Sequence, residues 1–268
     1  MPHWPSPPTA PTFAPVYGAV SSRVAGWLEM VGRVGHFSHD AVLAVRDVET
    51  WSGLTTTQMR RIGVQSLPIG LFIAAFTGVV LALQSSYTFT GAVPMYFVGT
   101  LVGKTVMLEL APVLTGLALA GRVGANIAAE LGTMRVTEQV DALETLAYNP
   151  YSYLVVPRLI ASTVMFPLVV GLAMAMGVTS GWITSINLLD LSTVEFVKGL
   201  QLFYQFKDVW FGLVKATSFG FTVALIGCIK GLSVRGGAEG VGRAATESVV
   251  LSAELILVLD AFWALTLL

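Results

Sequence analysis

Two long stretches of the chain contain no charged residue. One runs from Ile62 to Gly103 and the other from Leu159 to Leu189. A transmembrane helix needs about 20 mainly apolar residues, so both stretches can cross the hydrocarbon core of a bilayer. The full pattern predicts an all-α integral membrane protein. Its five spanning helices are expected at about 64–86, 95–121, 153–184, 209–232 and 246–267.

The segment before the first span has a different pattern. Residues 1–15 contain half of the twelve prolines, which predicts a disordered tail. From about residue 20 to residue 50, apolar side chains recur at helical spacing and charged residues fill the positions between them. This pattern predicts an N-terminal amphipathic helix, or two, lying in the membrane interface. A second, short surface helix is expected within Leu191–Phe206, between the third and fourth spans.

Basic residues are distributed unequally between the two sides of this five-span arrangement. Arginine dominates one side, which holds Arg60, Arg61, Arg122, Arg135, Arg158, Lys230, Arg235 and Arg243. Only lysines lie on or toward the other side, namely Lys104, Lys198, Lys207 and Lys215. Because basic residues concentrate on the cytoplasmic side of membrane proteins, we expect the N-terminus in the cytoplasm and the C-terminus outside.

The densest polar stretch, residues 119–150, connects the second and third spans and would therefore be cytoplasmic. Apolar residues at helical spacing predict a short amphipathic helix there; they are Val136, Val140, Leu143 and Ala147. Thr137 is a candidate N-cap, and Asn149-Pro150 is a stop signal. The glycines before the helix, Gly121, Gly124 and Gly132, permit close helix contacts or sharp turns.

Composition excludes several classes of function. Hydrophobic residues make up 54% of the 268 residues and charged residues 12%, with a net charge of −1, so no basic face is available for nucleic acid. His36 and His39 share a helix face, but no third ligand accompanies them, and we predict no metal site. "GTLVGKT", at 99–105, has three residues between its glycines where a phosphate-binding loop needs four. The chain is therefore expected to lack an ATPase site of its own.

The segment "ELAPVLTGLALAGRVGANIAAELGTMRVTEQVDALETL", residues 109–146, closely resembles the signature region of the MlaE/YrbE permease family. Weaker similarity extends to "VLDAF" near the C-terminus. The resemblance implies one permease domain over 16–268, in a bacterial inner (plasma) membrane. It also implies a non-enzymatic subunit of an ABC transporter for phospholipids or related lipids. The expected assembly is a homodimer with two ATPase subunits that bind ATP and Mg, and an MCE-domain protein on the outer face.

By the same resemblance, the short cytoplasmic helix is a coupling helix that docks on the ATPase. The polar residues expected to face the ATPase are Arg135, Glu138, Gln139 and Asp141. Other residues match the family motif and are expected to be structural: Gly121, Arg122, Gly124, Glu130 and Gly132.

The candidate lipid-cavity residues lie in spans one, two and four. Glu109, three residues before Pro112, sits at membrane depth, where a carboxylate requires a polar cavity or a basic partner. Lys104 and Lys215 are the candidate partners. The Lys215 ammonium would attract a lipid phosphate or extend to the interface, and the sequence leaves both alternatives open. In span one the resemblance indicates cavity-lining positions at Val80, Leu83, Gln84 and Tyr87. Asp260 also matches the family, with no role beyond pairing.

Three other classes of protein fit the sequence less well. An ABC permease for a hydrophilic solute would place a glycine in its coupling segment where this chain has Ala147. An intramembrane enzyme using Glu109 would need a second catalytic group at similar depth, and no histidine follows His39. A channel would need a polar pore lining, which the spans do not show. The lipid permease is the reading that fits best.

Overall fold

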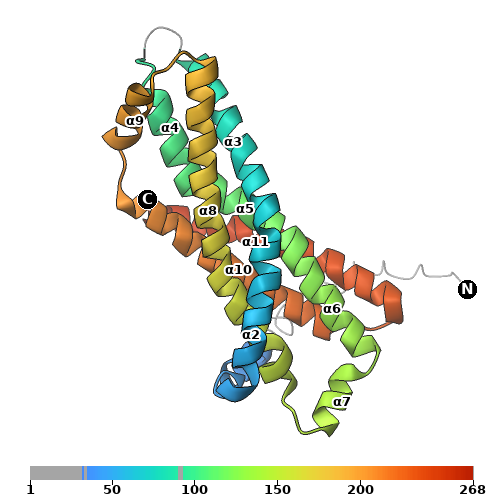
Figure 1. The fold of residues 1–268 in the computed structure, drawn as a ribbon. Helices are drawn as coiled ribbons and strands as arrows, with labels where there is room; N and C mark the ends of the chain where they lie inside the picture. The colour runs from blue at the N-terminus through green and yellow to red at the C-terminus, as the bar shows by residue number, and fades with distance from the viewer. Residues whose placement is uncertain (1–31, 33–34, 90–92, 268) are drawn as a thin grey trace, which may run out of the picture. The chain divides into compact units, whose positions relative to one another are not determined.

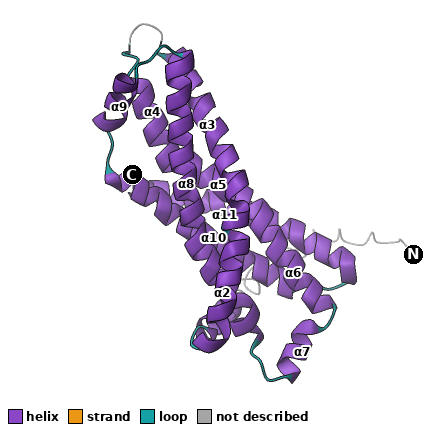
Figure 2. Cartoon of the chain, in the orientation of Figure 1, coloured by secondary structure: helices purple, strands orange, loops and turns teal. Residues whose placement is uncertain are grey.

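The computed structural model describes residues 32, 35–89 and 93–267, and within them every regular element is a helix (Figures 1 and 2). The chain divides into two compact units, Met1–Leu43 and Ala44–Leu268. In the first unit residues 35–43 are helical, whereas the predicted tail at 1–15 lies outside the described residues. Within the described part of the predicted amphipathic segment, a turn follows residue 44 and a new helix begins at Val48, and the sequence had left open whether the segment forms one helix or two. Its interfacial position stays a prediction.

The second unit holds the membrane-spanning part. Its elements are α2 Val48–Ile62, the 3-10 turn η1 Val64–Ser66, α3 Leu67–Thr88, α4 Phe97–Thr105, the π-turn η2 Val106–Leu110, α5 Ala111–Leu119, the π-turn η3 Ala120–Gly124, α6 Ala125–Val136, α7 Gln139–Thr145, the π-turn η4 Tyr151–Val155, α8 Val156–Leu188, α9 Thr193–Leu202, α10 Phe206–Leu232 and α11 Gly237–Leu267. Contiguous elements join into longer helices.

Five helical stretches of the described chain are long and apolar enough to cross a membrane. They are Val48–Thr88, Phe97–Val136, Tyr151–Leu188, Phe206–Leu232 and Gly237–Thr266. The five predicted spans are confirmed in number and order. The observed helices are longer, because backbone hydrogen bonding continues where the sequence turns polar and a hydropathy pattern no longer registers it. α7 and α9 lie at opposite ends of this unit (Figure 1).

The second span is one continuous helix that widens at two π-turns. In the first, the Ala111 N–H bonds to the carbonyl of Val106, five residues back. The turn directly precedes Pro112, which has no N–H and cannot complete a regular α-helical ladder. The break that a proline causes in a regular helix is accommodated here by a π-turn, a feature that often marks functional sites in helices.

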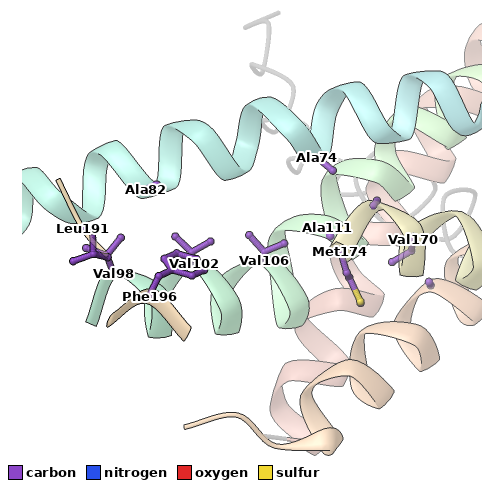
Figure 3. Packing of buried hydrophobic residues seen from close by; sticks show 12 residues of the cluster. Ala74, Ala82, Val98, Val102, Val106, Ala111, Val170, Met174, Leu191 and Phe196 are labelled. Carbon is purple, nitrogen blue, oxygen red and sulfur yellow. The ribbon is translucent and has the colours of Figure 1, made fainter. Parts of the chain in front are cut away.

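Small residues hold the first and third spans together. A Cβ on Gly78 would lie 2.0 Å from the carbonyl oxygen of Gly177, so the two backbones touch directly. Ser180 donates to the Ala75 carbonyl across the same contact, at 2.8 Å. Figure 3 shows Ala74 and Ala82 of α3 beside the apolar face of the second span. Buried side chains of that face recur every four residues, at Val98, Val102 and Val106.

The predicted surface helix between the third and fourth spans is α9, which confirms the expectation with tighter ends. Ser192 and Glu195 form a capping box in which each side chain accepts from the other's backbone N–H. The Ser192 hydroxyl also donates to the exposed Glu195 carboxylate, and this bond together with the one from the Ser192 N–H lowers the pKa of that carboxyl. Phe196 is buried, and Thr100 donates to the Gly199 carbonyl. α9 is thereby fastened to α4.

Candidate functional site

An ion-pair cluster around Lys215 lies between the spans. Its ammonium lies 2.7 Å from the carboxylate of Glu109 and 2.9 Å from that of Asp260. The Lys215 side chain is 3% exposed, whereas Glu109 is 34% exposed and Asp260 21%. One buried cation from α10 thus joins carboxylates of η2 and α11 that both reach the surface of the subunit.

Pro112 explains a third contact of this ammonium. In a regular helix the N–H of residue 112 would bond to the carbonyl of Leu108, but proline has none. Lys215 Nζ donates to the Leu108 carbonyl instead, at 3.3 Å. A buried carbonyl without a donor is costly, particularly in a membrane. The lysine therefore satisfies the backbone group that Pro112 leaves open and positions the neighbouring Glu109.

Of the two candidate partners of Glu109, the structure selects Lys215. Lys104 instead lies 3.9 Å from Asp208, near the start of α10. The sequence left open whether Lys215 attracts a lipid phosphate or extends to the interface, and in the subunit its side chain is buried against these partners. The Lys215 ammonium donates to Glu109 and to the Leu108 carbonyl. Its contact with Asp260 is an ion pair without hydrogen-bond geometry. Asp260, for which the sequence suggested no role other than forming an ion pair, completes the cluster.

The four predicted cavity positions of α3 form a single stripe. Val80, Leu83, Gln84 and Tyr87 recur at helical spacing and are all exposed. They lie on the face of α3 opposite the residues that pack inward, Ala74, Gly78, Ala82 and Ser85. The structure thus groups these four residues together on an uncovered apolar surface of the subunit, apart from the buried Lys215. Their contact with lipid stays a prediction.

The motif residues near the α7 end have distinct surroundings. Glu130 pairs with Arg61 of α2 at 3.1 Å and with the buried Arg158 of α8 at 3.2 Å, so it ties three helices together. Its predicted bracing role agrees with this geometry. Gly124 and Gly132 meet Val223 and Val234 closely, as expected for helix contacts. Gly121 faces open space instead.

The predicted coupling segment is helical, but its details differ from the sequence pattern. α7 begins at Gln139, so the N-cap position belongs to Glu138 and not to Thr137. Val136 belongs to α6, and only Val140 of the expected apolar stripe is buried. The helix ends at Thr145, ahead of Asn149-Pro150, because Ala147 adopts a left-handed conformation, with φ 61°. The N–H groups of Ala147 and Tyr148 bond to the carbonyls of Glu144 and Leu143, which is a Schellman motif.

The residues expected to face an ATPase lie close together at this end. Arg135 forms an ion pair with Asp141 across the turn between α6 and α7. Gln139 donates to the Thr137 hydroxyl at 3.0 Å. Glu138, at φ 60°, is exposed and left-handed. The sequence indicated that this face is polar. The Arg135–Asp141 pair depends on the geometry of the turn between α6 and α7, which the spacing of polar and apolar residues does not predict.

The fold and these sites define a multi-pass helical membrane protein with a charged cluster between its spans and a short polar helix at one end. The family model of permease MlaE matches residues 55–266. The chain belongs to the MlaE permease family and is an ABC transporter permease. This result confirms the resemblance of residues 109–146.

Several relatives match this chain over most of its length. A probable ABC transporter permease protein of Rickettsia felis is 40% identical over 243 residues, which covers 91% of this chain and 94% of the relative. A probable ABC transporter permease of Synechocystis is 41% identical over 208 residues, 78% of this chain and 79% of the relative. The intermembrane phospholipid transport system permease protein MlaE of Haemophilus influenzae is 30% identical over 243 residues, 90% of this chain and 93% of the relative.

Proposed function

We propose that this chain is the permease subunit of an ATP-driven transporter that moves phospholipid, or a related lipid, between membranes. The observation that carries the proposal is the similarity to the Haemophilus influenzae intermembrane phospholipid transport permease across 90% of the chain. The protein would reside in the bacterial inner membrane with its N-terminus in the cytoplasm. Arginines at the α7 end and lysines near α9 support that orientation.

The energy would come from a separate ATPase that binds ATP and Mg. α7 is the proposed coupling helix, because Val140 anchors it while Glu138, Gln139 and Asp141 are exposed. The surface is acidic: Arg135 balances one of its three carboxylates, those of Glu138, Asp141 and Glu144. We therefore expect the groove of the ATPase that receives α7 to be basic, since complementary charge orients partners during association.

The lipid pathway would form between two copies of the chain. The exposed stripe of α3 at Val80, Leu83, Gln84 and Tyr87 would face acyl chains. The partly exposed side chains of Glu109 and Asp260 would border the same pathway, while Lys215 stays buried and holds them in place. Two ATPase subunits would dock at the α7 ends, and an MCE-domain protein would bind on the α9 side. The permease itself would catalyse no chemical step.

Native mass spectrometry of the complex, purified in mild detergent from the source cells, tests this proposal. We expect two permease chains, two ATPase subunits and bound phospholipid. Arg135→Glu should lower lipid-stimulated ATPase activity several-fold, because it replaces the pair with Asp141 by like-charge repulsion and so disturbs the turn that positions α7. Asp141→Arg in the same chain restores the pair and should recover part of the activity. A complex without an ATPase, or one that releases a hydrophilic solute and no lipid, would contradict the proposal.

A further inference from the structure

A second polar site lies at the α7 end of the bundle, and it shares no residue with the Lys215 cluster. It is a cleft of about 300 Å³ between the α2–η1 segment and the end of the second span. Its apolar floor is formed by Ile62, Val123 and Ile127. Its polar lining comes from Gln58, Arg61, Gln65, Arg122, Asn126 and Glu130. An apolar base with amide and guanidinium groups around it is suited to an amphiphile with a polar head.

The charges around this cleft favour an anion. Arg61, Arg122 and Glu130 line the cleft, and Arg158 pairs with Glu130 from α8, so these four side chains carry a net charge of +2. Glu130 is already shared by Arg61 and Arg158. Arg122 is exposed and forms no ion pair with any residue in the described part of the chain. Its planar fork of N–H donors is therefore available to a ligand, and phosphate is a group that such a fork binds bidentately.

The depth of the cleft identifies the layer from which a ligand would come. Arg61 directly precedes the first charge-free run, and Arg122 is the first charged residue after Glu109 in the second span. Both arginines therefore mark the level at which an apolar span meets water. A cleft between them lies in the headgroup layer, where lipid phosphates are concentrated.

We propose that this cleft binds the phosphate of an anionic phospholipid headgroup. Arg122 holds the phosphate oxygens, and Gln58, Gln65 and Asn126 offer amide donors to the headgroup. The floor of Ile62, Val123 and Ile127 receives the glycerol end of the acyl chains. Glu130 repels the ligand only weakly, because two guanidinium groups already neutralise it. The site is separate from the Lys215 cluster, so it goes beyond the transport pathway proposed above.

The test measures dissociation constants on the purified full-length chain in neutral detergent micelles. The probes are dioctanoyl phosphatidylglycerol, dioctanoyl phosphatidylcholine and glycerol 3-phosphate. A charge-assisted hydrogen bond contributes enough that its loss weakens binding by about tenfold or more. We expect Arg122→Gln to weaken phosphatidylglycerol binding by about that factor and Arg122→Lys to weaken it less. Arg60→Gln is the matched control, because it removes the same charge nearby from a residue that does not line the cleft.

The outcomes separate the sources of the phosphate. Tight phosphatidylglycerol binding that depends on Arg122, with weak glycerol 3-phosphate binding, supports a lipid headgroup. Equally tight, Arg122-dependent binding of glycerol 3-phosphate overturns the lipid assignment in favour of a soluble phosphate. Binding that Arg122→Gln leaves unchanged, or that phosphatidylcholine matches, overturns the proposal. An unliganded melting temperature equal to that of the unaltered chain shows that each variant is folded.

Discussion

Replacing Lys215 with methionine should be among the most damaging single changes in the spans. Methionine has nearly the length of lysine, so the change removes the charge while preserving most of the packing. It leaves the carboxylates of Glu109 and Asp260 facing each other without the cation that lies 2.7 and 2.9 Å from them. It also removes the donor to the Leu108 carbonyl, which Pro112 has already deprived of its backbone partner.

The magnitude follows from burial. Removing one partner of a buried ion pair costs about 3–5 kcal/mol, because the remaining charge is left uncompensated. Here the lysine is buried but Glu109 is 34% exposed, so polar surroundings reduce the penalty on that carboxylate. We therefore expect Lys215→Met to lower the free energy of unfolding by about 3 kcal/mol, at the lower end of that range.

Equilibrium unfolding in mixed micelles, with increasing SDS, measures this loss. The triple variant Glu109→Gln, Lys215→Met, Asp260→Asn should be more stable than Lys215→Met alone, because it leaves no unpaired charge. Lys198→Met is a matched control at an exposed lysine of α9. A Lys215→Met variant within about 1 kcal/mol of the control would refute the reasoning. So would a triple variant less stable than the single one.

Two further predictions concern the backbone. Gly78→Ala should lower the free energy of unfolding by about 1–3 kcal/mol, because its Cβ would meet the Gly177 carbonyl. Gly53→Ala, at an open position of α2, should be neutral or stabilising in the same unfolding assay. Equal effects of the two substitutions would contradict the close contact between Gly78 and Gly177. Ala147→Gly should stabilise the end of α7 by about 1 kcal/mol, because glycine adopts φ 61° without strain. Slower hydrogen exchange at residues 147 and 148 is the expected readout, and faster exchange would show that the Schellman motif does not limit opening.

Hydropathy alone determined the number, order and approximate centres of the spans. The preference for hydrocarbon over water is nearly a sum over single residues, so a run such as Leu159–Leu189 is recognised as a span without knowledge of the helices that pack against it. The family could also be recognised from sequence alone, because the motif at 109–146 is contiguous. Helix ends were less well determined. α7 stops at Thr145 because Ala147 turns left-handed, and alanine gives no sequence signal for that conformation.

The charged contacts were decided by tertiary structure. The sequence restricted the partner of Glu109 to Lys104 or Lys215, which lie 5 and 106 residues away in the chain. Only the packing of α10 against the second span chose Lys215, and only the approach of α11 added Asp260. Pairing at membrane depth depends on which helix faces come together, and a one-dimensional pattern does not contain that information. The sequence could therefore require that Glu109 have a partner, while the fold determined which residue it is.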